Sequence, residues 1–242
     1  MADFFTMQPG EAAAPVPPGP VLSRGSTGMR RIHRFLLWAY GEAPDLVRST
    51  APGDRARAGY VGEVLGNFHK VLLVHQEGEE LLMYPRLAER APASAPHVDQ
   101  MLDHHRQVRD RVESIEAVRK RWMQTAGAGD RDEVAQRHED LQTVLNEHLR
   151  REVTEVMPVV DRVMTDKELS ALPKHGVDQH DKKFLVAYLG MVLATNPPDE
   201  RRKIFYEEIP APVRLAYRLI GRRMYLRQHS MLFPGRPIPE TL

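Results

Sequence analysis

One pattern occurs twice in the chain and constrains its fold more than any other feature. The stretch "LLVHQEGEELLMYP" contains His75, with Glu79 four residues later and Pro85 ten residues later. The stretch "NEHLRREVTEVMPVV" repeats this spacing 73 positions further on, with His148, Glu152 and again a proline. Composition alone would give about 0.1 such patterns in a chain like this. The repeat therefore indicates two related segments with the same structure.

Both copies predict helices that turn ionisable side chains inward. Residues four apart lie on nearly the same face of a helix, so each histidine points the same way as its glutamate. Leu72 and Leu82 share the face of His75, and Leu145 and Val156 share that of His148. A single buried His and Glu pair is more often a core hydrogen bond than a ligand pair. Because the pair occurs twice at the same spacing, a pair of ligands is favoured over a core hydrogen bond.

A second pair of histidines follows the same internal repeat. His33 in "MRRIHRFLL" and His105 in "LDHHRQVRD" lie 72 positions apart, and each is followed by arginine. Both have apolar neighbours at helical spacing. His104 is an alternative to His105, but it breaks the register of the repeat. We expect His69 and His138, which lie well around their helices from the ligand face, to be surface residues.

The chain has no long stretch that alternates with period two, so we expect an all-α protein. The first helix starts near Met29 and should stop by Pro44, since proline disfavours helical geometry in the residue before it. Three longer helices follow, and short connections favour an antiparallel up-down four-helix bundle. The expected helices are 55–90, 96–124 and 131–163. The expected domains are a flexible Pro/Ala-rich tail (1–27), the bundle (28–163) and a helical C-terminal extension (164–242).

The composition excludes several classes of function. The absence of cysteine rules out disulfides, thiolate catalysis and iron–sulfur ligation. A formal net charge of +1, from 34 basic and 33 acidic residues, provides no general attraction for nucleic acid or anionic lipid. No apolar stretch has the roughly 18 to 20 residues of a membrane span, and the N-terminus does not resemble a signal peptide. We therefore expect a cytoplasmic protein that binds neither nucleic acid nor membrane.

The inward glutamates need positive charge nearby, because burying an unpaired carboxylate costs several kcal/mol or more. Two metal ions would supply it. Four imidazoles and two bridging carboxylates can hold two cations a few ångströms apart, and nitrogen and oxygen ligands suit iron or manganese. The candidate metal ligands are His33, His75, Glu79, His105, His148 and Glu152.

At these residues the chain resembles the hemerythrin-like (HHE cation-binding) family over about residues 29–163. "HQEGEELLMYP" and "HLRREVTEVMP" resemble the signatures of the family's second and fourth helices. The resemblance implies two oxo- or hydroxo-bridged iron ions, ahead of manganese or zinc. The four histidines would be terminal ligands, and the two glutamates would bridge. It also implies binding of or reaction with O2, H2O2 or NO, with an unknown electron donor.

The chain departs from oxygen-carrying members of that family at two positions. They have a second histidine where this chain has Arg109, and an aspartate five residues after the fourth-helix histidine, where this chain has Glu152 at four. These departures favour peroxide or NO detoxification at least as much as oxygen carriage. A seventh ligand could be water, Tyr40 or Tyr84, although hydrogen bonding or packing is the better reading of both tyrosines.

Three interpretations stay open at this point. The first is a di-iron protein, whose activity as an enzyme is undecided. The second is a sensor or metal-binding module without turnover, which signals through the C-terminal helices. The third is a metal-free bundle in which the repeat is a relic of duplication. Whether the chain forms a homodimer is also open.

Overall fold

The computed structural model describes residues 4–242, except for the side chain of Lys183. Every regular element of these residues is a helix, which confirms the all-α prediction. The chain divides into two compact units, with the division after Gly176. The sequence pattern predicted the end of the bundle at residue 163. The difference arises because two short helices, α7 (Asp166–Leu169) and most of α8 (Ala171–Asp178), group with the bundle.

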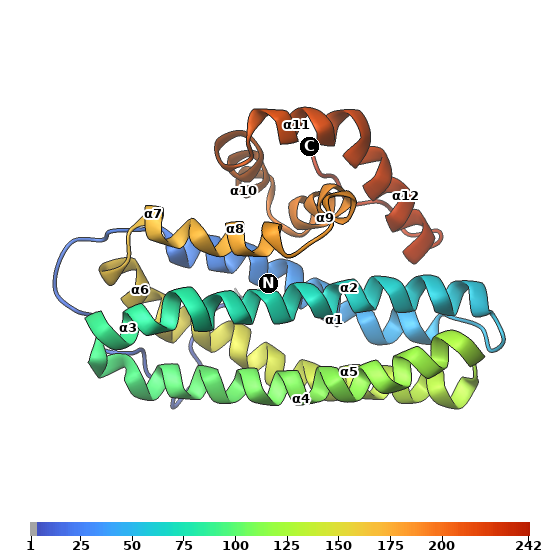
Figure 1. Ribbon diagram of the computed structural model, residues 1–242, viewed down its shortest axis with the longest axis horizontal. Helices are drawn as coiled ribbons and strands as arrows, with labels where there is room; N and C mark the ends of the chain where they lie inside the picture. Colours follow the sequence, from blue (N-terminus) through green and yellow to red (C-terminus); the bar gives the residue numbers. More distant parts are fainter. Residues whose placement is uncertain (1–3) are drawn as a thin grey trace. The chain divides into compact units, whose positions relative to one another are not determined.

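The first unit is a four-helix bundle. Its long helices are α1 (Gly25–Arg48), α2 (Arg55–Gly78), α4 (Ala95–Thr125) and α5 (Ala128–Arg151). Figure 1 shows these helices running side by side, and both α1 and α4 contact both α2 and α5. Since the connections between successive helices are short, neighbours along the chain run antiparallel. Their apolar faces therefore enclose one common interior.

Two of the long helices contain a widened turn at the repeated motif. These turns are η1 (Glu79–Met83), continued by α3 (Tyr84–Arg90), and η3 (Glu152–Val156), continued by α6 (Met157–Val163). Both turns are π-helical and start at the motif's glutamate. Pro85 and Pro158 follow directly, and a proline ring would clash with the backbone of an ordinary helical turn before it. The wider turn relieves that clash, so the recurring proline marks a bulge of the kind found at functional sites.

The predicted end of the first helix at Pro44 is wrong, because α1 continues through this residue to Arg48. Proline has no N–H group, so the carbonyl of Tyr40 loses its partner within the helix. The side-chain amide of Gln142 on α5 donates a hydrogen bond to this carbonyl instead. A partner on a neighbouring helix therefore compensates for the proline, and no rule about local sequence could have shown it.

Replacing Gln142 with alanine should leave the carbonyl of Tyr40 buried without a partner. We expect a loss of about 1–3 kcal/mol of stability, measured by chemical denaturation. Exchanging Pro44 for alanine restores an N–H donor, so Gln142→Ala should cost less in the Pro44→Ala background. Equal losses in both backgrounds would contradict the assigned role. The exposed Gln136→Ala on the same helix is the control.

The segment before α1 packs along the bundle, although its composition predicted a flexible tail. Phe5 and Ala14 are buried at 4% and 2% exposure. The N–H of Ala14 donates to the carbonyl of Glu155 at 3.0 Å, and that of Leu22 donates to the carbonyl of Asp161 at 2.7 Å. The segment is non-helical, as its prolines indicate, but backbone hydrogen bonds and apolar contacts fix its described part to the last helix of the bundle.

The second unit is a smaller helical body with its own core. Its helices are α9 (Lys182–Thr195), α10 (Pro198–Lys203), α11 (Ala211–Ala216) and α12 (Arg222–Leu232), with π turns Ile204–Glu208 and Tyr217–Gly221. Leu193, Phe205 and Tyr217 form its buried core. Among the described residues, no helix combines the length and apolar character needed to span a lipid bilayer.

Candidate metal centre

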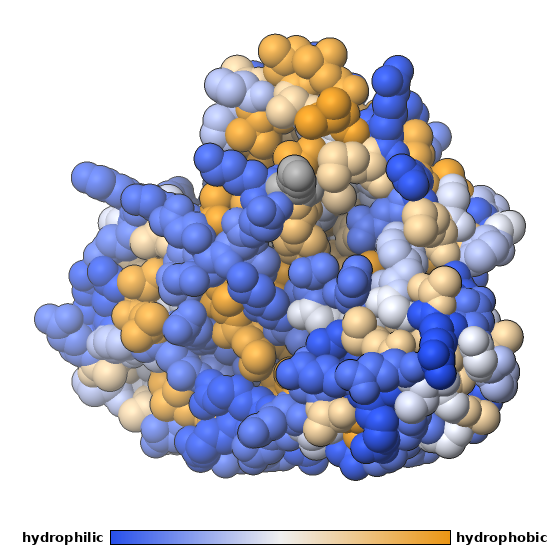
Figure 2. All heavy atoms as spheres, turned by 45° about the vertical axis from the view of Figure 1, so that its right-hand side comes forward, coloured by the Kyte–Doolittle hydropathy of each residue, from blue (hydrophilic) through white to orange (hydrophobic). Residues whose placement is uncertain are grey.

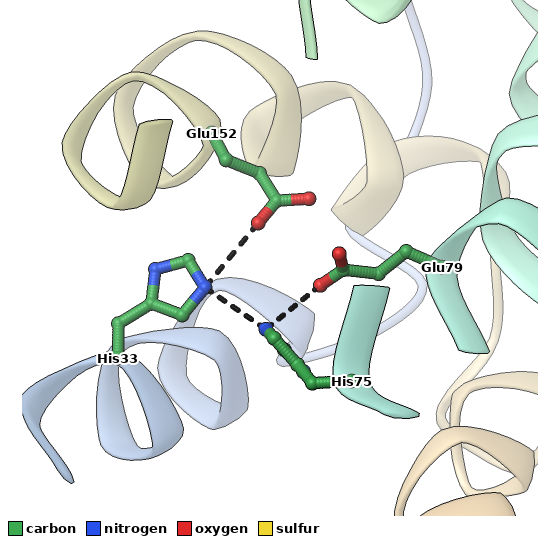
Figure 3. Close-up of side chains that lie close together, drawn as sticks. All are labelled: His33, His75, Glu79 and Glu152. Atoms are coloured by element: carbon green, nitrogen blue, oxygen red, sulfur yellow. Dashed lines mark hydrogen bonds and ion pairs between the residues drawn. The ribbon is translucent and has the colours of Figure 1, made fainter. Parts of the chain in front are cut away.

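The structure brings all six predicted ligands together inside the bundle. They form two overlapping groups, and within each group the potential ligand atoms lie within 4.8 Å of one another. The first group is His33, His75, Glu79 and Glu152, drawn in Figure 3, and the second is Glu79, His105 and His148. Each of the four long helices contributes a histidine. The two glutamates come from the first positions of the two π turns.

Glu79 belongs to both groups and connects them. Its Oε1 atom lies 3.0 Å from Nε2 of His75, and its Oε2 atom lies 3.4 Å from Nε2 of His105. The two oxygens of one carboxylate thus face imidazoles from two different groups. A carboxylate placed in this way can bridge two neighbouring cations, whereas a simple core hydrogen bond would need only one of its oxygens.

The rest of the first group is arranged around His33. Its Nε2 atom lies 3.2 Å from Nε2 of His75 and 3.3 Å from Oε2 of Glu152 (Figure 3). The hydroxyl of Tyr84 donates to the other oxygen of Glu152, Oε1, at 2.8 Å. Tyr84 therefore orients a candidate ligand through a hydrogen bond, which was the favoured interpretation of this residue.

Several buried polar atoms of the two groups have no hydrogen-bond partner among the described residues. His148 is fully buried, and neither of its ring nitrogens has a partner. The same holds for Nε2 of His105, both oxygens of Glu79 and Oε2 of Glu152. Buried polar atoms without partners are costly, and here they converge on one place in the bundle. Lone pairs of nitrogen and oxygen gathered in this way fit a site for metal cations.

The outer nitrogens of two of these histidines are held by partners. Nδ1 of His33 donates to the carbonyl of Leu149 at 2.9 Å, and Nδ1 of His105 pairs with Oε1 of Glu80 at 2.8 Å. Arg109 donates to the same oxygen of Glu80 at 2.6 Å. Such contacts fix the ring and direct Nε2 toward a metal. Arg109, which departs from the family pattern, thus holds the carboxylate that orients His105.

The neighbouring imidazoles and carboxylates shift one another's pKa values in the candidate centre. Burial alone would raise the pKa of Glu79, but the neighbouring imidazoles of His75 and His105 hold it well below its ordinary value. Burial opposes the charged form of His105, yet the neighbouring carboxylates of Glu79 and Glu80 raise its pKa to about 9. Burial lowers the pKa of His148 well below its ordinary value. Its neutral imidazole is the form that binds metals.

Among the described residues of the bundle, three further buried histidines lie outside the two groups of candidate ligands. His105 faces Glu79, whereas His104 lies outside both groups, as the repeat register indicated. The expected surface positions of His69 and His138 are wrong, since their exposures are only 2% and 0%. Each helix of a four-helix bundle packs against two neighbours. The buried part of its surface is therefore wider than the narrow face that carries the candidate ligands. Each of these two histidines has an apolar residue four positions before it and another three positions after it. This spacing indicates burial and was overlooked.

Comparison with known proteins supports a cation-binding bundle. The model of the hemerythrin HHE cation-binding domain matches residues 24–160, which include all six candidate ligands. Searches of curated proteins and of solved structures each gave no match.

Proposed function

Because the chain belongs to the hemerythrin HHE cation-binding family, we propose that its bundle holds two iron ions that bind or react with O2, H2O2 or NO. The observation that carries this proposal is the position of Glu79, whose two oxygens face His75 and His105. A carboxylate whose two oxygens face imidazoles of different groups is suited to bridging two ions, whereas a mononuclear site has no use for such a bridge.

The proposal gives each side chain a role. His33 and His75 would hold one ion, His105 and His148 would hold the other, and Glu79 would bridge them. Glu152 would be the second bridge, because its Oε2 atom lies 3.3 Å from Nε2 of His33 and 4.0 Å from Nε2 of His148. Iron at this position would supply electron transfer and an exchangeable binding position for a small ligand.

The candidate centre borders a buried apolar cluster. Met83, Leu87, Met101 and Val156 are fully buried in the apolar cluster at this end of the bundle. The ring of Phe5, from the segment before α1, lies 6.3 Å from that of His33. Such apolar walls favour small, weakly polar ligands such as O2 and NO over larger, charged ones.

Stopped-flow absorption on the full chain tests the proposal. Protein loaded anaerobically with two ferrous ions should change its spectrum after mixing with O2, H2O2 or NO, and repeated consumption of H2O2 or NO would establish an enzyme. The Glu79→Gln variant should lose the response. No spectral change with any of the three ligands, despite two bound irons, would overturn the proposed reactivity.

A sensor without turnover is the second candidate, and the surface of the second unit favours it. Figure 2 shows apolar side chains gathered over this unit, where Leu215, Leu219 and Ile220 are 58%, 62% and 55% exposed. Exposed apolar patches often mark contacts with other proteins. Ligand-dependent protection of Ala211–Ala216 (α11) from hydrogen exchange, without turnover, would support the sensor, and unchanged exchange would exclude it.

Replacing Glu80 with glutamine should weaken metal binding without removing a proposed ligand. Glu80 accepts from both His105 and Arg109, and the neutral amide would hold the imidazole less firmly. We expect a 10–100-fold (about 1–2 decades) loss of metal affinity, measured by competition with a chelator. Arg106→Gln, which affects an exposed neighbour of His105, should leave the affinity unchanged. Equal affinities of Glu80→Gln and wild type would refute the orienting role.

Metal affinity should rise with pH up to about 9, because an ion must displace the proton of His105, whose pKa is raised to about 9. Below that pH, this one proton should weaken binding about tenfold per pH unit, measured by titration calorimetry. The folding stability of the metal-free protein should show the opposite trend and fall as pH rises. His105 stabilises it fully below its ordinary pKa, and this contribution is lost as pH rises through the folded value. An affinity that is constant from neutral pH to pH 9 would contradict the prediction.

A further inference from the structure

A second pair of buried histidines lies in the bundle, away from the candidate di-iron centre. His69 on α2 and His138 on α5 have exposures of 2% and 0%, and their Nε2 atoms lie 3.2 Å apart. His69 precedes His75 by six residues, or ~9 Å along the helix, and His138 precedes His148 by ten residues, or ~15 Å. The pair therefore belongs to a different layer of the interior.

Both outer nitrogens of this pair are engaged. Nδ1 of His138 donates to the carbonyl of Val134 at 2.8 Å, and Nδ1 of His69 lies 2.6 Å from Oε1 of Glu116. Arg119 donates to both oxygens of Glu116 and fixes this carboxylate. A carboxylate or a backbone carbonyl behind each imidazole is the arrangement that orients metal-binding histidines.

The protons of His69 and His138 are placed so that the lone pairs of their two Nε2 atoms face each other. Burial raises the pKa of Glu116, but hydrogen bonds from His69 and Arg119 lower it to about 2, so it is a carboxylate that only accepts. The Nδ1 atoms of His69 and His138 must then both carry protons. Burial lowers the pKa of both histidines, which favours their neutral forms. In those forms neither Nε2 atom has a proton to share with the other.

The spacing of the two Nε2 atoms matches that of two ligands on one ion. Nitrogens at 2.0–2.1 Å from a tetrahedral zinc ion lie about 3.3 Å apart. The observed 3.2 Å between His69 and His138 is close to this value and equals the distance between His33 and His75 in the candidate centre. A cation between the two nitrogens would remove the repulsion between their lone pairs.

Tyr40 supplies a third candidate ligand. Its ring centroid lies 6.0 Å from that of His69 and 6.5 Å from that of His138. Its side chain is buried, with 2% exposure for the residue, and its hydroxyl has no hydrogen-bond partner among the described residues. Leaving a phenol unpaired in the interior is costly, whereas a phenolate oxygen is a good ligand that also offsets the charge of a cation.

We propose that His69, His138 and Tyr40 form a separate mononuclear site for a zinc-type divalent cation. Two imidazoles with one oxygen ligand suit zinc, with the fourth position left to water. Glu116 and Arg119 act as positioning residues behind His69. This site does not depend on the reactivity or the metal of the di-iron centre.

Zinc content of full-length variants tests the site. Glu79→Gln removes the bridge of the other centre, so this variant should retain one tightly bound zinc ion per chain after dialysis. Adding His138→Gln should remove that ion. Adding Tyr40→Phe, which preserves the packing of the ring, should weaken its binding by more than about tenfold. Tyr60→Phe on α2 is the matched control and should change nothing.

The outcomes separate the two centres. If Glu79→Gln retains no zinc, or if folded Glu79→Gln/His138→Gln retains as much as its parent, the pair of His69 and His138 does not bind zinc and the proposal is overturned. Should the His138 variant fail to fold, the Tyr40→Phe result decides, because a purely structural phenol would leave the zinc affinity unchanged. If the protein loaded with ferrous ions does not react with O2, H2O2 or NO but keeps this zinc ion, only the di-iron proposal is refuted.

Discussion

Replacing Glu79 with glutamine is expected to abolish tight metal binding in both groups of the candidate centre. The carboxylate faces His75 with one oxygen and His105 with the other, and it is fully buried. Glutamine has the same shape, but its amide is neutral and has only one oxygen. Since disturbing an outer contact already costs 10–100-fold (about 1–2 decades), loss of the bridge should lower affinity by more than about 100-fold.

Metal analysis of the purified variant after iron loading measures this effect. Glu89→Gln, on the exposed face of α3, is the control and should keep the full iron content. Retention of both iron ions by Glu79→Gln would show that this carboxylate does not bridge. Retention of one tightly bound iron ion would mean that the two groups bind iron independently.

Replacing His148 with alanine should have a different signature, because His148 belongs only to the second group. We expect the loss of one iron ion per chain, while the ion beside His33 and His75 is retained. The buried ring also fills space in the interior, and its removal leaves Glu79 and Glu152 with less compensation. We expect a loss of about 3–5 kcal/mol of stability, visible as a lower Tm in calorimetry.

The exposed Asn146→Ala on the same helix controls for general effects of a substitution in α5. An unchanged iron content together with an unchanged Tm for His148→Ala would remove His148 from the site. Comparison with Glu79→Gln is informative, since the bridge should affect both ions and His148 only one.

The sequence was sufficient to predict the helices and the convergence of the six candidate ligands. A repeated His and Glu pair within an apolar stripe defines a helix, its inward face and its register in a single pattern. The repeat then located His33 and His105, which have no adjacent acid of their own at that spacing. His105 rather than His104 followed from the register, and the structure directs His105 toward Glu79.

The features that the sequence did not reveal depend on contacts between distant segments. The side chain of Gln142 compensates for Pro44 from another helix. Glu80 orients His105 from the neighbouring helix, and no local pattern distinguishes it from a solvent-exposed glutamate. His69 and His138 are different, because each has an apolar residue four positions before it and another three positions after it, and this spacing indicates burial. They were predicted to lie at the surface because only the narrow helical face that carries the ligands was taken as buried.

Anomalous diffraction from crystals of the iron-loaded protein tests the central claim most directly. The account predicts two iron peaks in the bundle interior, one beside His33 and His75 and the other beside His105 and His148, with Glu79 between them. A single peak, or no peak with these side chains still converging, would contradict a dinuclear centre.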